Sequence, residues 1–229
     1  MNYQNIWKKA EKIIPGGNGL LSKRPKRFLS SGWPTYYKKA KGIYLWTLDN
    51  KKLIDFSIMG IGTSVLGYAN SVIDNKVKSA IDNGINTTLN CIEEYELAKE
   101  ILKYNKFAHQ VKFAKGGGEA MSMAIRIARS NSKKYKVVFS GYHGWHDWYI
   151  SANLTNKRNL NNHLLKNLKP LGVPKNLKDS IIPLKFNDHL ELKKIFKENK
   201  DAGILVIEGA RNDYPSLEFV KTINELKSK

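Results

Sequence analysis

One stretch of the sequence decides the fold: FAKGGGEAMSMAIRIARSNSKKYKVVFSGYHGWHD, residues 113–147. A short apolar run at 111–114 stops at three consecutive glycines, 116–118, and predicts a strand followed by a sharp turn. A second apolar run, 135–139, predicts another strand and leads into a loop rich in aromatic residues and histidine. Between the two runs, apolar residues at helical spacing predict a helix: Ala120, Met123, Ala124, Ile127 and Ala128.

Glycines 116–118 stand where the backbone passes from the first predicted strand into the helix. Because glycine has no Cβ, the chain can turn sharply there and approach a ligand closely. The first N–H groups of a helix lack partners within the helix and carry the positive end of its dipole, so they bind phosphate readily. A flexible turn without a ligand explains the glycines equally well. The GK[ST] ending and the G-x-G-x-x-G spacing are both missing, which excludes two common phosphate-binding fingerprints.

The loop at 141–149, GYHGWHDWY, places planar side chains after the second predicted strand. Ligands of open α/β sheets bind at the carboxyl ends of parallel strands, so this loop is a candidate site. A phosphate-binding turn beside a stacking aromatic ring suits a flat, phosphorylated cofactor. His143, His146 and Asp147 could instead bind a metal, but stacking and hydrogen bonding in a cofactor loop explain them as well.

With these motifs in order, the chain resembles the amino-terminal portion of the class III, pyridoxal-phosphate-dependent aminotransferases. It is most similar to their glutamate-1-semialdehyde aminomutase-like branch. Single motifs are weak signals, but their ordered set is specific and extends from about Trp7 to the end of the chain. The set includes IPGG at 14–17, LLSKRP at 20–25, GGEA at 117–120, IRIAR at 125–129 and GYHGWHDWY at 141–149.

The resemblance implies pyridoxal 5'-phosphate as cofactor and a role for each matching position. Gly117 and Gly118 would offer backbone N–H groups to the cofactor phosphate. Tyr142 would stack on the pyridine ring with His143 beside it, and Glu208 matches a glutamate at the end of a buried strand near the cofactor. Small-molecule donors and acceptors of an amino group would be the substrates, and the family pattern implies a homodimer.

The chain also departs from the family pattern. Gly116 and Gly118 replace residues that often carry hydroxyls, and Gly209 stands where proline is usual. The lysine that bonds to the cofactor and the aspartate that pairs with the pyridine nitrogen would both lie beyond Lys229. We therefore expect a chain that is inactive alone, truncated before its lysine, unless a complementing carboxyl-terminal chain supplies the rest. A non-catalytic remnant or partner subunit is the alternative.

Substrate contacts are expected from the loop at 18–34, which passes over the active site in the resembled family. Ser22 and Arg24 could meet a substrate anion there, with Arg27 nearby. A solvated basic loop without a ligand is the competing interpretation of these residues.

Alternating strand and helix signals predict an α/β fold of the fold-type-I pyridoxal-phosphate transferase kind. We expect a partial, mostly parallel sheet with flanking helices and a small N-terminal hairpin region. The expected domains are residues 1–60, with a helix, the active-site loop and the hairpin, and residues 61–229, an incomplete cofactor-binding domain. The other expected helices are 6–14, 70–83, 93–104, 163–168, 190–196 and 216–226, and the other strands are 43–46, 52–56, 181–186 and 203–208.

Composition narrows the function classes. The 229 residues are 41% hydrophobic, which suffices for a folded core, and no apolar run is long enough to span a bilayer. A single cysteine, Cys91, and the lack of a signal-peptide pattern favour a cytoplasmic protein. The formal charge of +19 is carried mostly by lysines spread along the chain, which argues against specific nucleic-acid binding.

Overall fold

The computed structural model describes residues 3–29, 32–163, 166–210 and 213–227. The chain divides into two compact units, Met1–Glu94 and Tyr95–Lys229, and each is described by itself. The domain boundary predicted at residue 60 stays a prediction, because a compact unit and a family domain need not end at the same residue.

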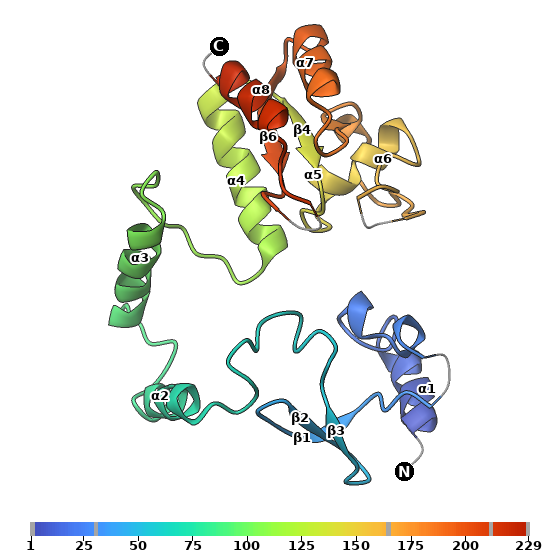
Figure 1. Cartoon of the computed structure of the whole chain (residues 1–229), viewed down its shortest axis with the longest axis vertical. Coiled ribbons are helices and arrows are strands. Elements are labelled where there is room, and N and C mark those ends of the chain that lie inside the picture. Colours follow the sequence, from blue (N-terminus) through green and yellow to red (C-terminus); the bar gives the residue numbers. More distant parts are fainter. Residues whose placement is uncertain (1–2, 30–31, 164–165, 211–212, 228–229) are drawn as a thin grey trace. The chain divides into compact units, whose positions relative to one another are not determined.

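The first unit contains a small antiparallel sheet of three strands in the order β1-β2-β3 (Figure 1). The predicted hairpin is its β2–β3 pair, in which Leu45 lies opposite Leu53. Strand β1 lies on the other side of β2 and was not predicted, because its sequence, YKKAK, lacks an apolar alternation. The elements are α1 (Tyr3–Ile13), η1 (Leu21–Lys23), η2 (Pro25–Arg27), β1 (Tyr37–Lys41), β2 (Tyr44–Thr47) and β3 (Lys52–Ile54).

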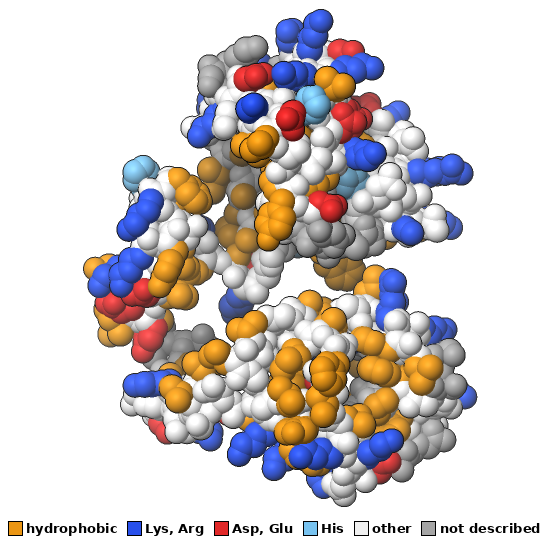
Figure 2. Space-filling model, viewed as in Figure 1, with side chains coloured by type: hydrophobic (Ala, Val, Ile, Leu, Met, Phe, Trp, Pro, Cys, Tyr) orange, Lys and Arg blue, Asp and Glu red, His pale blue; other side chains and the backbone are white. Residues whose placement is uncertain are grey.

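Two helices follow the small sheet, α2 (Ser71–Asp82) and α3 (Ile92–Tyr104), close to their predicted bounds. The Asn70 side chain caps α2 by accepting hydrogen bonds from the Val72 and Ile73 N–H groups. Neither helix contains a buried residue. The space-filling view shows hydrophobic side chains on the surface there (Figure 2). On α2 the exposed apolar residues include Val72, Ile73, Val77 and Ile81.

The second unit is built on a parallel sheet with the strand order β5-β4-β6 (Figure 1). The predicted strands at 135–139, 181–186 and 203–208 are confirmed within a few residues. The strands are β4 (Lys136–Ser140), β5 (Ile181–Pro183) and β6 (Ala202–Ile207). The helices are α4 (Gly117–Ser132), α5 (Asp147–Ile150), α6 (Ala152–Thr155), η3 (Lys175–Leu177), α7 (His189–Glu198) and α8 (Leu217–Lys227).

Strand β4 is the centre of the core because both of its faces are covered. Val137 and Phe139 point to one face, where they pack with Ile125 of α4 and Tyr149 of α5. Val138 points to the other face. There α7 and α8 contribute Leu192, Ile195 and Phe219. Because successive residues of a strand face opposite sides, the continuous apolar run at 137–139 is the expected signature of a strand buried on both sides.

Two local predictions differ from the structure. Residues 111–114 form no strand, since no described segment pairs with them, and a strand needs a hydrogen-bonding neighbour. The helix predicted at 163–168 is also wrong for its described part, where the chain makes turns, while residues 164–165 lie outside the described residues. Asn161, whose side chain accepts a hydrogen bond from the Asn167 N–H, stabilises a turn there instead.

Lysine and arginine side chains are scattered over the visible face of each unit and do not gather in one stripe (Figure 2). None of the helices in the described ranges is long and apolar enough to cross a bilayer.

Candidate functional site

The amino-terminal end of α4 presents unpaired backbone donors. The Glu119 carboxylate folds back and accepts hydrogen bonds from the Lys115 and Gly116 N–H groups, at 3.2 Å each. No acceptor among the described residues pairs with the N–H groups of Gly117 and Gly118. A Cβ on Gly117 would meet nothing within 4 Å, so the space in front of these donors is open.

The loop after β4 lies directly on this helix end. A Cβ on Gly144, whose φ is +92°, would stand only 2.9 Å from the Gly118 Cα. A Cβ on Gly118 would in turn stand 2.9 Å from the His146 ring. The His146 Nδ1 lies 2.8 Å from the Ser122 Oγ on the next turn of α4. The glycines therefore serve a close approach of two backbones, which a merely flexible turn would not require.

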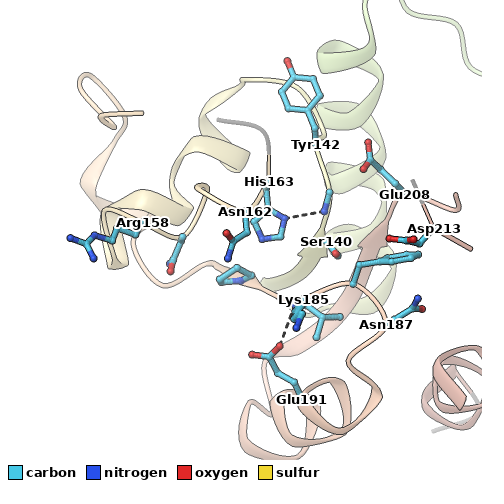
Figure 3. Close-up of a pocket in the computed structure, with 15 residues that line it drawn as sticks. Ser140, Tyr142, Arg158, Asn162, His163, Lys185, Asn187, Glu191, Glu208 and Asp213 are labelled. Atoms are coloured by element: carbon cyan, nitrogen blue, oxygen red, sulfur yellow. Dashed lines mark hydrogen bonds between the residues drawn. The ribbon is translucent and has the colours of Figure 1, made fainter. Parts of the chain in front are cut away.

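Tyr142 is half-buried at the edge of the same loop. Its ring packs edge-on against Tyr149, with centroids 6.0 Å apart and an interplanar angle of 86°. In the close-up its ring extends away from the other labelled side chains (Figure 3). Its stacking on a cofactor ring stays a prediction.

His143 turns inward and holds the loop. It is buried, and its Nε2 lies 2.8 Å from the Ser140 carbonyl oxygen. A carbonyl only accepts, so Nε2 carries the proton in this arrangement. Burial lowers the pKa of His143, an effect that the hydrogen bond to Ser140 and the charge of Glu208 partly oppose. His143 is thus a neutral support of the loop, and its predicted contact with the cofactor stays a prediction.

His163 is a site residue that the sequence pattern did not reveal. Its Nδ1 accepts a hydrogen bond of 3.0 Å from the Gly141 N–H, so this nitrogen carries no proton. Burial lowers the pKa of His163, and the nearby His143 lowers it further. The Tyr149 hydroxyl donates to the Gly141 carbonyl at 2.9 Å. Both backbone groups of Gly141 are therefore held by side chains from α5 and from the irregular segment that follows it.

Glu208 follows β6 and lies against the carboxyl end of β4. A Cβ on Gly141 would come within 2.6 Å of the Glu208 Cγ and Oε2. Strands β4 and β6 are parallel neighbours, so both residues emerge at the same edge of the sheet. Glu208 therefore lies beside Gly141, the first residue of the loop that carries Tyr142.

A cavity of about 730 Å³ opens at this edge of the sheet. Tyr142 and Glu208 line it together with His163 and Lys185, whereas Gly117 and Gly118 are not among its lining residues (Figure 3). The predicted cofactor residues thus fall into two neighbouring groups. The loop at 141–146 joins them, because it contributes Gly141 and Tyr142 to the cavity and packs Gly144 on the α4 end.

Ser22 and Arg24 belong to the first unit, in and beside the short helix η1. The Arg24 guanidinium folds over Gly16, where a Cβ would collide with it. The substrate contact predicted for both residues stays a prediction.

Comparison with known proteins shows the family to which this chain belongs. The Aminotransferase class-III family model matches residues 30–202. The chain is 30% identical over 228 residues to the glutamate-1-semialdehyde 2,1-aminomutase of Sulfurisphaera tokodaii, covering 97% of this chain and 52% of that protein. It is 28% identical to the 3-aminobutyryl-CoA aminotransferase of Cloacimonas acidaminovorans, covering 97% and 51%.

A solved transaminase with PLP bound shares the fold with a TM-score of 0.81, at 22% identity, and the match covers 98% of this chain and 52% of that one. The chain thus spans about half the length of the relatives it matches. The family model and the shared fold agree with the motifs from which the site is built. The chain belongs to the class-III aminotransferase family.

Proposed function

We propose that this chain binds pyridoxal 5'-phosphate beside the amino-terminal end of α4 and the loop at 141–146 that packs on it. The observation that carries the proposal is the close packing of Gly144 on Gly118, which sets an aromatic loop beside unpaired helix N–H groups. A phosphate accepts hydrogen bonds from such groups, and the helix dipole favours its negative charge. The chemistry of the donors therefore fits the phosphorylated end of this cofactor.

Each residue predicted to bind the cofactor has a specific role in this proposal. The N–H groups of Gly117 and Gly118 bind the phosphate, and Tyr142 covers one face of the ring. Glu208 supplies a carboxylate at the sheet edge, and His143 holds the loop in place through its hydrogen bond to the Ser140 carbonyl. When bound, the cofactor supplies an electron sink for bond changes at the carbon that carries the substrate amino group.

The reaction class we propose is amino-group transfer or migration on a small molecule. The names of the similar relatives support this, since one is an aminomutase and the other an aminotransferase. No lysine in this sequence matches the family's cofactor-bonding position. Turnover would accordingly need a lysine and an aspartate supplied from beyond these 229 residues, on the same polypeptide or on another. We further propose that the working protein is a cytoplasmic homodimer.

A non-catalytic partner subunit is the second candidate. The specific observation in its favour is the exposed apolar face of α2, which no described residue buries. Such a subunit would be stable only in complex and would bind the cofactor weakly or not at all.

Binding of pyridoxamine 5'-phosphate, measured by calorimetry, tests the proposal. This probe has no aldehyde and does not react with the many surface lysines. We expect binding by the native chain and its loss in Gly144→Ala, because the added methyl would push the loop off α4. Gly172→Ala is the matched control, with a φ of +80° but open space around the methyl. Failure of the native chain to bind would refute the proposal and favour the second candidate.

A further inference from the structure

His146 occupies an unusual place at the end of α4. The Cδ2–Nε2 edge of its ring stands 2.9 Å from the point where a side chain on Gly118 would begin. An imidazole from the neighbouring loop thus fills the space that a residue with a side chain would fill at this helix position. His146 as a whole is an exposed residue.

Ser122 sets the orientation of this ring. Its hydroxyl donates to the Gly118 carbonyl at 2.9 Å and lies 2.8 Å from the His146 Nδ1. A hydroxyl has one proton to donate, so when that proton goes to Gly118, Nδ1 must donate to the Ser122 oxygen. With Nδ1 committed to Ser122, Nε2 is the nitrogen left to meet a ligand at the α4 end.

We propose that His146 is an additional phosphate-binding residue of this site, one that replaces the side-chain donor missing at Gly118. The inference rests on the proposed cofactor function. When the phosphate binds at the Gly117 and Gly118 N–H groups, the ring takes up a proton at Nε2 and donates it in a charge-assisted hydrogen bond. Ser122 acts as a positioning residue, because it holds Nδ1 and keeps the ring turned toward Gly118.

The experiment compares two probes on the 229-residue chain, pyridoxamine 5'-phosphate and unphosphorylated pyridoxamine. For His146→Ala we expect the affinity for the phosphorylated probe to fall about tenfold or more, since hydrogen bonds to charged groups are strong. The affinity for pyridoxamine should not change. His109→Ala, which removes an exposed histidine elsewhere, should leave both affinities unchanged.

Two further measurements separate binding from simple loss of structure. In chain labelled with ¹⁵N-histidine, the phosphorylated probe should shift the His146 Nε2 resonance, and Ser122→Ala should diminish that shift. In Gly118→Ser combined with His146→Ala, a new hydroxyl should restore part of the phosphate-dependent affinity.

The possible failures are distinguishable. If the native chain binds neither probe, the cofactor proposal falls and the His146 inference falls with it. If the native chain binds the phosphorylated probe and His146→Ala binds it equally well, the cofactor proposal stands and the role of His146 is refuted. An unshifted Nε2 resonance on binding would refute it in the same way.

Discussion

Replacing Gly141 by alanine tests the close contact between Gly141, which follows β4, and Glu208, which follows β6. Gly141 has a φ of +101°, a region that residues with a Cβ rarely adopt. The new methyl would also stand 2.6 Å from the Glu208 Cγ, an atom close to the backbone that cannot swing away freely. The Gly141 N–H bond to His163 would be disturbed by any backbone shift that relieved the contact.

The expected loss follows from these two effects. Holding a non-glycine residue at such a φ costs about 1–3 kcal/mol. Overpacking against the half-buried Glu208 side chain costs roughly another 1–3 kcal/mol. We therefore expect Gly141→Ala to lower the free energy of unfolding of the second unit by about 2–6 kcal/mol, a large part of the 5–15 kcal/mol typical of a domain.

Two control glycines separate the effects. Gly172→Ala has a φ of +80° and no atom within 4 Å of the new methyl, so it reports the backbone effect alone. Gly209→Ala has neither feature, and we expect a change within about 0.5 kcal/mol. Adding Glu208→Ala to Gly141→Ala should recover the overpacking part.

Native-state hydrogen exchange of the β4 amides is the appropriate assay, since these amides lie in the centre of the second unit and report its opening. A loss in Gly141→Ala no larger than in Gly172→Ala would refute the contact with Glu208. If Gly141→Ala lowers the free energy of unfolding no more than Gly209→Ala does, both the backbone effect at Gly141 and its contact with Glu208 are refuted.

Three further predictions concern single interactions. Burial lowers the pKa values of His143 and His163 in the folded chain. As the pH falls, these histidines therefore bind protons at a higher pH in the unfolded chain than in the folded chain. The second unit should thus keep its full stability above about pH 6.5 and lose up to about 1.4 kcal/mol per pH unit per histidine below it. Urea unfolding at pH 7.5 and 5.5 checks this, and His163→Asn but not His109→Asn should reduce the slope. Asn70→Ala should cost α2 about 1 kcal/mol of cap energy and lower the helical circular dichroism; no change would contradict the cap. Thr47→Val removes the buried hydroxyl that bonds the Lys51 backbone, and faster β2–β3 amide exchange, by about 1–3 kcal/mol of opening energy, is expected; unchanged exchange would refute that role.

The elements that could be predicted are those whose signal is local. Strand β4 carries three consecutive apolar residues, 137–139, because its two faces are both covered. Helix α4 was predicted from its apolar spacing, but the face that packs on the core carries Ile125 with Met121 and Ala128, while Ile127 of the predicted stripe is exposed. The run at 111–114 carries the same kind of signal, yet it forms no strand within the described residues. A strand is a property of a pair of segments, and the sequence of one segment does not contain its partner.

In the candidate site, too, the residues that lie close together in the sequence could be predicted, and the distant one could not. Gly117, Gly118 and Tyr142 lie in one continuous stretch whose strand, turn and loop order implies their neighbourhood. The inward turn of His143 is set by a buried carbonyl three residues earlier, which no residue pattern records. His163 reaches Gly141 across 22 positions, out of a segment without periodicity, so its role became visible only when the chain was folded.

The two histidines of the loop, His143 and His146, have different surroundings. Both histidines stand in the same short motif, and both suited stacking, metal binding or hydrogen bonding equally well. His143 points into the core, where burial lowers its pKa and its Nε2 bonds the Ser140 carbonyl, whereas the exposed His146 lies against the end of α4, where its Nδ1 meets the Ser122 hydroxyl. A loop that must lie on α4 through Gly144 has one side facing the core and one facing the helix donors. The phosphate contact that we propose belongs to the second histidine of the motif, whereas the family pattern places the first beside the pyridine ring, and that contact stays a prediction.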